Sequence, residues 1–152
     1  MKKQIDVTQE YIKKATPKQG RLLYEDDYDK ESHKEEVNLA KWLLNTFGGE
    51  IILLSESGGT FGAKRSDFEW RGRYWELKTL KSEKSIDSAL RKAISQIYDK
   101  PGGVILDFGN NKAVSMAKIE SAVKSRIEVS CRFNIDVMVI RFGKIEKVFR
   151  YK

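Results

Sequence analysis

The chain has 152 residues, of which 40% are hydrophobic and 34% are charged, a balance typical of one globular domain with its own core. No apolar run approaches the roughly 20 residues that span a bilayer, and the basic N-terminus lacks the apolar segment of a secretory signal, so we expect a cytoplasmic protein without a membrane partner. One cysteine and one histidine exclude an intrachain disulfide and a Cys/His structural zinc site, and the net charge of +7 favours an anionic partner such as nucleic acid.

The first 31 residues are highly charged and mixed in sign, and we expect them to form an extension in front of a single domain over residues 32–152. Within this extension the pattern predicts a short helix over Val7–Ala15, which the breaker Thr16–Gly20 ends. The acidic run Glu25–Asp29 has no metal-ligand spacing that we can identify, and we interpret it as a solvated loop.

The next predicted element is an amphipathic helix from Ser32 to Phe47. Ser32 and Glu35 have the S-x-x-E spacing of a capping box, apolar residues recur at helical spacing, and a glycine pair follows the last of them. Glu36 lies at the edge of the apolar face, and His33 lies one turn before it. A metal site beside a sheet needs a carboxylate in such a place; a solvated glutamate and a surface histidine are the alternative.

An apolar run at Glu50–Ser55 is typical of a core strand. The residues that follow, 56–65, are rich in glycine and end in Lys64 and Arg65, but they lack the G-x-x-x-x-G-K-[ST] form of a P-loop. We expect either a loop that flanks a phosphate-binding cleft, with Lys64 and Arg65 as substrate contacts, or a plain connection within a hairpin.

The stretch Ser66–Thr79 predicts two strands joined by a tight turn at Arg71–Arg73. Side chains alternate between the two faces of a strand. If the aromatic and aliphatic residues of this hairpin face the core, Asp67, Glu76 and Lys78 converge on its other side.

The rest of the chain continues the alternation of helices and strands. Apolar spacing predicts a helix over residues 86–97, a core strand at Val104–Asp107, a helix over Ser115–Ile127, and a final pair of strands at Ile135–Arg141 and Lys144–Arg150. This order indicates an α/β (α+β) fold with a mixed central sheet. Basic side chains that lie off the apolar stripes of the helices should attract phosphate groups without sequence preference: Arg91, Lys92, Lys118, Lys124 and Arg126.

The spacing D-x8-E-x-K from Asp67 to Lys78 suits the hydrolysis of a phosphodiester. A divalent cation lowers the pKa of bound water and neutralises charge in the transition state. Mg²⁺ takes hard oxygen ligands and few of them from protein, so Asp67 and Glu76 are sufficient, and Glu36 can complete the shell. Lys78 can orient the attacking water or contact the phosphate. We expect Mg²⁺, with Zn²⁺ or Mn²⁺ as alternatives.

The predicted order of elements around this motif resembles the α-β-β-β-α-β core of the PD-(D/E)xK nuclease superfamily. Asp67, Glu76 and Lys78 stand at the positions of the family motif. Ser66 takes the place of the usual proline, a departure that removes no chemical group.

A second resemblance covers His33 to the C-terminus. The segments HKEEVNLAKWLLNTFGGEIILL, SDFEWRGRYWELKT, LRKAISQIYDKPGGVILD and IDVMVIRFGKIEKVFRYK are similar to the C-terminal tRNA nuclease domain of contact-dependent growth-inhibition (CdiA) toxins, and related domains occur in proteins of phages and mobile elements. The resemblance implies a metal-dependent ribonuclease that cuts tRNA and travels with an immunity protein. It implies that Glu36 is the helix carboxylate, that Asp67 and Glu76 are the strand carboxylates and that Lys78 is the catalytic lysine. His33 and Gln96 match recurrent family positions of less certain role.

Three other functions stay open. A metal-independent ribonuclease of the barnase/EndoU-like group would use His33 as acid or base and Lys78 to stabilise the phosphorane. A DNA nuclease of the same superfamily would use the same motif, and a non-enzymatic nucleic-acid-binding phage module would use none of it. The structural alternative for Glu76 and Lys78 is an exposed salt bridge, worth at most about 1 kcal/mol.

Overall fold

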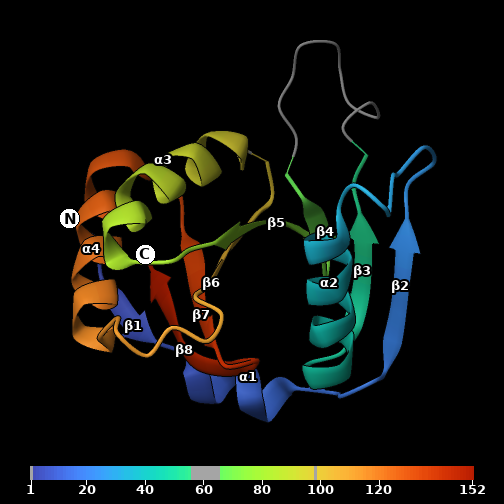
Figure 1. The fold of residues 1–152 in the computed structure, drawn as a ribbon, viewed down its shortest axis with the longest axis horizontal. Helices are drawn as coiled ribbons and strands as arrows, with labels where there is room; N and C mark the ends of the chain where they lie inside the picture. Colours follow the sequence, from blue (N-terminus) through green and yellow to red (C-terminus); the bar gives the residue numbers. More distant parts are fainter. Residues whose placement is uncertain (1, 56–65, 98) are drawn as a thin grey trace.

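The computed structural model describes residues 2–55, 66–97 and 99–152. Their strands form one mixed eight-stranded sheet in the order β1-β8-β7-β6-β5-β4-β3-β2 (Figure 1). The strands are β1 (Gln4–Asp6), β2 (Gly20–Tyr24), β3 (Gly49–Leu53), β4 (Phe68–Trp70), β5 (Arg73–Thr79), β6 (Pro101–Asp107), β7 (Ile135–Arg141) and β8 (Lys144–Tyr151). The helices are α1 (Thr8–Lys14), α2 (Lys34–Thr46), α3 (Ile86–Gln96), which a short 3₁₀ turn (Glu83–Ser85) precedes, and α4 (Met116–Ser130).

The sheet combines parallel and antiparallel pairs. Strands β5, β6 and β7 run parallel to one another, as do β2 and β3. The pairs β3–β4, β4–β5, β7–β8 and β1–β8 are antiparallel. Since the elements α2-β3-β4-β5-α3-β6 follow one another in the predicted order, the expected mixed α+β fold is confirmed.

Helices cover both faces of the sheet and divide the core in two. On one face, α3 and α4 pack on the alternate β6 residues Val104 and Leu106, among others. On the other face, α2 and the start of α1 pack on a layer that includes Ile105, Phe68 and Trp75. In Figure 1, α3 and α4 lie together at one side of the molecule, and α2 lies beside β3 and β4. The period-two alternation of β6 explains how one strand supplies both cores.

The N-terminal residues are part of this sheet and do not form a separate extension. Strand β1 pairs with β8, and β2 pairs in parallel with β3. Val7 is buried in the core on the α2 face. The boundary that we expected between residues 31 and 32 therefore does not divide the sheet.

The predicted hairpin is present as β4 and β5. Phe68 pairs with Trp75 and Trp70 with Arg73, so Arg71 and Gly72 form the connection. Both have positive φ angles, 52° at Arg71 and 79° at Gly72. Such a pair is typical of the two-residue turn whose twist matches antiparallel strands.

The helix boundaries agree with the periodicity, but the expected capping box at the start of α2 is wrong. The N-cap residue is His33, and no side chain caps it. The Ser32 hydroxyl instead donates to Asp29 Oδ2 at 2.6 Å. At α4 the side chain of Ser115 does cap, because its oxygen accepts from the Lys118 N–H at 3.2 Å. Among the described residues no helix is both long and apolar enough to cross a membrane.

Candidate active site

The register of the hairpin brings Asp67 and Glu76 together. Because Phe68 pairs with Trp75, the next residue on each strand places Asp67 opposite Glu76. The Asp67 backbone is held by Leu54, the residue after β3, whose N–H donates to the Asp67 carbonyl at 3.1 Å. Its carboxylate accepts from the Leu77 N–H at 2.7 Å. Hydrogen bonds thus fix both the backbone and the side chain of Asp67.

Glu76 is a carboxylic acid inside the protein. The residue is only 1% exposed, and its Oε1 atom has no hydrogen-bond partner among the described residues. Lys78, two residues along the same face of β5, places Nζ 3.8 Å from Glu76 Oε2. A salt bridge on an exposed strand would have both partners in water, so that alternative does not describe this pair.

Glu36 approaches from the first turn of α2. The start of this helix meets the end of β5, where the Thr79 hydroxyl donates to Glu35 Oε2 at 3.3 Å. Glu36 itself is half-buried and accepts a hydrogen bond from the Tyr28 hydroxyl at 2.7 Å. Glu36 is close enough to Asp67 for the two carboxylates to repel each other.

Burial and this repulsion change the proton affinity of two carboxylates. Burial, and then the charge of Asp67, raises the pKa of Glu36 to about 7. The same two causes raise the pKa of Glu76 to about 9, and the Lys78 ammonium opposes them without cancelling them. Asp67 therefore lies within electrostatic reach of both glutamates. A bound cation would favour the charged forms of Glu36 and Glu76.

The other expected site residues have different places. His33 lies at the N-terminus of α2, where its Nδ1 atom is 2.9 Å from the Asp29 carbonyl and its ring packs on Tyr28, with centroids 5.4 Å apart. Gln96 ends α3, and its side-chain oxygen is buried without a partner among the described residues. The Gln96 carbonyl accepts from the Ser66 hydroxyl at 3.1 Å, which ties α3 to the residue before Asp67.

Only some of the basic residues that we expected to contact phosphate lie in the described part of the chain. Lys64 and Arg65 lie outside the described residues. Arg91 and Lys92 are exposed on α3. Arg126, on α4, makes a bidentate ion pair with Asp87, with both N···O distances 2.8 Å, so its charge is already matched.

Carboxylate oxygens suit a hard divalent cation, but the described residues form no ready-made metal cage. Among residues 2–55, 66–97 and 99–152, no group of three or more His, Cys, Asp and Glu side chains is arranged to hold a metal ion. Mg²⁺ keeps several waters and needs one or two carboxylates. Asp67 with Glu76 meets that need, and the unpartnered Glu76 oxygen is an available ligand.

Tyr28 is the residue of this site that sequence reasoning missed. It belongs to the acidic run that we interpreted as a solvated loop. It is half-buried, and its hydroxyl binds Glu36. The only signal in the sequence was the position of Tyr28 within an acidic run, and such a pattern is too common to predict a contact.

Comparison with known proteins places the fold. No protein-family model and no curated protein sequence matches the chain. Among solved structures, the chain is similar to a chain of the CdiA-CT/CdiI toxin and immunity complex from Burkholderia pseudomallei. The two have 16% sequence identity and a TM-score of 0.50, and the match covers 84% of this chain and 98% of the other. This protein thus has a mixed α+β fold of the kind found in that complex.

Proposed function

We propose that the protein is a metal-dependent endoribonuclease of the toxin class that cleaves tRNA. The observation that carries the proposal is the buried carboxylate Glu76, which has Asp67 opposite it and the Lys78 ammonium 3.8 Å away. A buried acid with an unpartnered oxygen is costly for folding. Such a cost is common where a group serves a reaction.

We assign a role in the reaction to each side chain of the candidate site. Asp67 and Glu76 supply the hard oxygens for a divalent cation, Mg²⁺ above all, and Glu36 adds a carboxylate from α2. Lys78 donates to a phosphate oxygen or to the attacking water. When bound, the cation would neutralise charge that develops on the phosphate and help to activate water.

Charge and fold support the toxin class and its partners. A net charge of +7 favours a polyanion such as RNA. Similarity to a chain of a toxin and immunity complex supports a toxin with a cognate immunity protein. The carboxylate and lysine cluster supports the catalytic member of such a pair. By resemblance, the substrate is tRNA.

The proposal is tested by incubating the purified protein with tRNA and, separately, with duplex DNA. Each substrate is given Mg²⁺, Mn²⁺ or EDTA. We expect tRNA cleavage with either metal, none with EDTA, and little cleavage of DNA. Cleavage of tRNA in EDTA at the rate seen with metal would favour the metal-independent alternative. Preferential cleavage of DNA would favour the DNA nuclease.

A further inference from the structure

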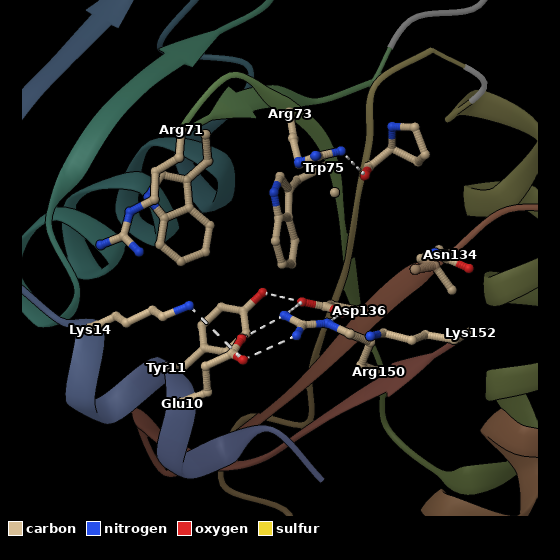
Figure 2. A pocket seen from close by; sticks show the side chains of 14 residues that line it. Glu10, Tyr11, Lys14, Arg71, Arg73, Trp75, Asn134, Asp136, Arg150 and Lys152 are labelled. Carbon is tan, nitrogen blue, oxygen red and sulfur yellow. Dashed lines mark hydrogen bonds and ion pairs between the residues drawn. The ribbon is translucent and has the colours of Figure 1, made fainter. Parts of the chain in front are cut away.

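A cavity of about 650 Å³ opens at the starts of the three parallel strands β5, β6 and β7. Arg73, Pro101 and Ile135, the first residues of these strands, line it. Its volume lies within the roughly 300–1,000 Å³ of small-molecule sites. Figure 2 shows the cavity with its side chains.

One side of the cavity is cationic. Arg71 and Arg73, at the hairpin turn, are both exposed (Figure 2). The Arg71 guanidinium lies over the Trp70 ring at 5.1 Å and donates to the Phe47 carbonyl at 2.7 Å. Arg73 makes a long hydrogen bond to the Pro101 carbonyl at 3.4 Å. Most of the hydrogen-bonding capacity of Arg73 is therefore available to a ligand.

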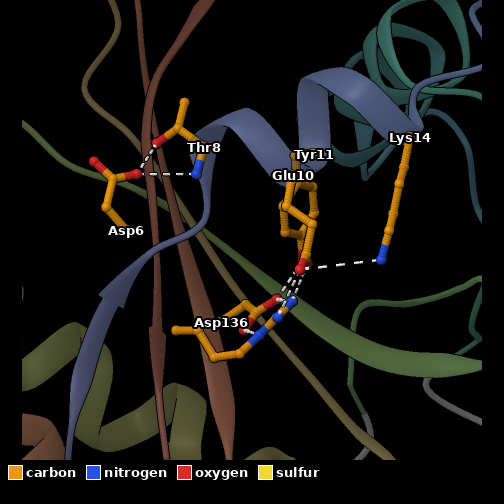
Figure 3. Close-up of polar contacts among 7 residues, drawn as sticks. Asp6, Thr8, Glu10, Tyr11, Lys14 and Asp136 are labelled. Atoms are coloured by element: carbon orange, nitrogen blue, oxygen red, sulfur yellow. Dashed lines mark hydrogen bonds and ion pairs between the residues drawn. The ribbon is translucent and has the colours of Figure 1, made fainter.

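The opposite side of the cavity is a polar network around two carboxylates, Glu10 and Asp136. Arg150 donates to both of them, with Nη2 2.7 Å from Glu10 Oε2 and Nε 2.8 Å from Asp136 Oδ1. The Tyr11 hydroxyl donates to Asp136 Oδ2 at 2.5 Å (Figure 3). Lys14 Nζ is 4.0 Å from Glu10. Lys152 also lines this side, which therefore holds three cations against two carboxylates. All four carboxylate oxygens already accept a hydrogen bond from Arg150 or Tyr11, and their remaining lone pairs are the acceptors that this side offers to a ligand.

Between the two sides stand indole rings. Trp75 projects into the space between the arginines and Asp136 (Figure 2). Trp70 packs against Trp75, with ring centroids 5.2 Å apart. Both rings are almost fully buried, at 2% and 4% exposed, so they form a firm apolar wall of which only a small area is open to a ligand.

We infer that this cavity binds a nucleotide, either free or at the end of an RNA strand. Arg71 and Arg73 would take the phosphate, because guanidinium groups match phosphate oxygens in pairs. The base would touch the small accessible area of the indole wall, with its amino groups toward Glu10 and Asp136. An exposed guanidinium plane such as that of Arg71 is also a surface on which bases stack.

The two-sided charge favours a nucleotide over an acidic peptide. A peptide of carboxylates would place negative groups throughout the cavity, including beside Glu10 and Asp136. A nucleotide has its negative charge at one end only. The cavity is also distinct from the candidate active site: Glu76 and Lys78 do not line it, and they point to the other face of β5 from Trp75.

Calorimetric titration with EDTA present and at low salt tests the inference. The probes are adenosine 5′-monophosphate, adenosine and inorganic phosphate. We expect the monophosphate to bind at least tenfold more tightly than either part alone. Arg73→Gln should weaken monophosphate binding at least fivefold and leave adenosine binding unchanged. Since Arg73 is exposed, the variant should unfold at the wild-type urea midpoint.

Two control variants locate the binding. Lys78→Ala, in the candidate active site, and Lys124→Gln, exposed on α4, should both bind the monophosphate as the wild type does. A 5′-phosphorylated trinucleotide that displaces the monophosphate identifies an RNA end as a ligand, and failure to displace it identifies the free nucleotide. Loss of binding in Lys78→Ala, wild-type binding in Arg73→Gln, or equal binding of a hexaglutamate peptide would each overturn the inference.

Discussion

The burial of the Glu76 carboxylate is unfavourable for the folded protein. A carboxyl group in a low-dielectric interior disfavours its charged form, and both burial and Asp67 act in that direction here. Lys78 is the cation nearest to it, yet the pKa of Glu76 stays raised. The metal-free protein therefore keeps a proton in the site near neutral pH.

This proton makes stability depend on pH. The raised pKa of Glu76, about 9 against an ordinary 4.5, means that the folded chain binds the proton more tightly than the unfolded chain. Between these two values the folded state holds more protons, so the free energy of unfolding falls as pH rises. Glu36 adds to this fall between 4.5 and about 7.

Glu76→Gln should flatten this dependence. The amide resembles the protonated acid in shape and cannot ionise, so the cost of charging is removed. In urea unfolding with EDTA, we expect the wild type to lose more than about 1 kcal/mol from pH 6 to pH 9, one pKa unit being worth about 1.4 kcal/mol. The variant should lose clearly less. Parallel curves for the two proteins would contradict the assignment of the buried proton to Glu76.

Tyr28→Phe should weaken the reaction more than the fold. Removing the hydroxyl leaves Glu36 without the hydrogen bond that orients it. We expect about tenfold slower tRNA cleavage and a loss of about 1 kcal/mol in the free energy of unfolding. Tyr24→Phe, on the neighbouring ring, is the matched control. If both variants cleave at the same rate, Tyr28 does not position Glu36.

At this scale the sequence predicted the hairpin residues but not their surroundings. The two-residue period placed Asp67, Glu76 and Lys78 on one side, and the structure agrees. Glu76 lies beside Val104 of β6, and α3 packs on β5, and the local pattern contains neither neighbour. The Tyr28 contact joins a loop to a helix turn, and no spacing rule predicts it.

At the scale of elements, α2 positions a carboxylate through its packing. Its buried residues, such as Leu43 and Val37, hold the helix on β2 and β3, and its first turn meets the end of β5. Helices and the long strands were predictable because their apolar periods are strong. The short edge strands β1 and β2 were not, because their partners β8 and β3 lie far along the chain.

Leu43→Ala tests how far α2 supports the fold. Leu43 is fully buried, so truncation removes apolar contacts and leaves a cavity. We expect a loss of about 2–5 kcal/mol in urea unfolding. Asn45→Ala, on the exposed side of the same helix, should change the free energy by less than about 0.5 kcal/mol. Similar losses in both variants would mean that α2 does not pack as described.

At the scale of the whole molecule, a cation that binds only the folded state should stabilise it. We expect 10 mM Mg²⁺ or 1 mM Mn²⁺ to raise the melting temperature by several degrees at pH 8, and EDTA to reverse the change. In Glu76→Gln the rise should be much smaller, because a carboxylate ligand is lost. An equal rise in the wild type and in Glu76→Gln would place the cation elsewhere.

The central claim is that Asp67, Glu76, Lys78 and Glu36 form one site for cleaving RNA. Its most direct test is single-turnover tRNA cleavage with Mg²⁺ by the wild type, Glu76→Gln, Lys78→Ala and the control Glu69→Gln, which changes the next acid along β4. We predict at least a hundredfold loss in the first two variants and a rate within threefold of the wild type for Glu69→Gln. Wild-type cleavage by Glu76→Gln or by Lys78→Ala would contradict the account.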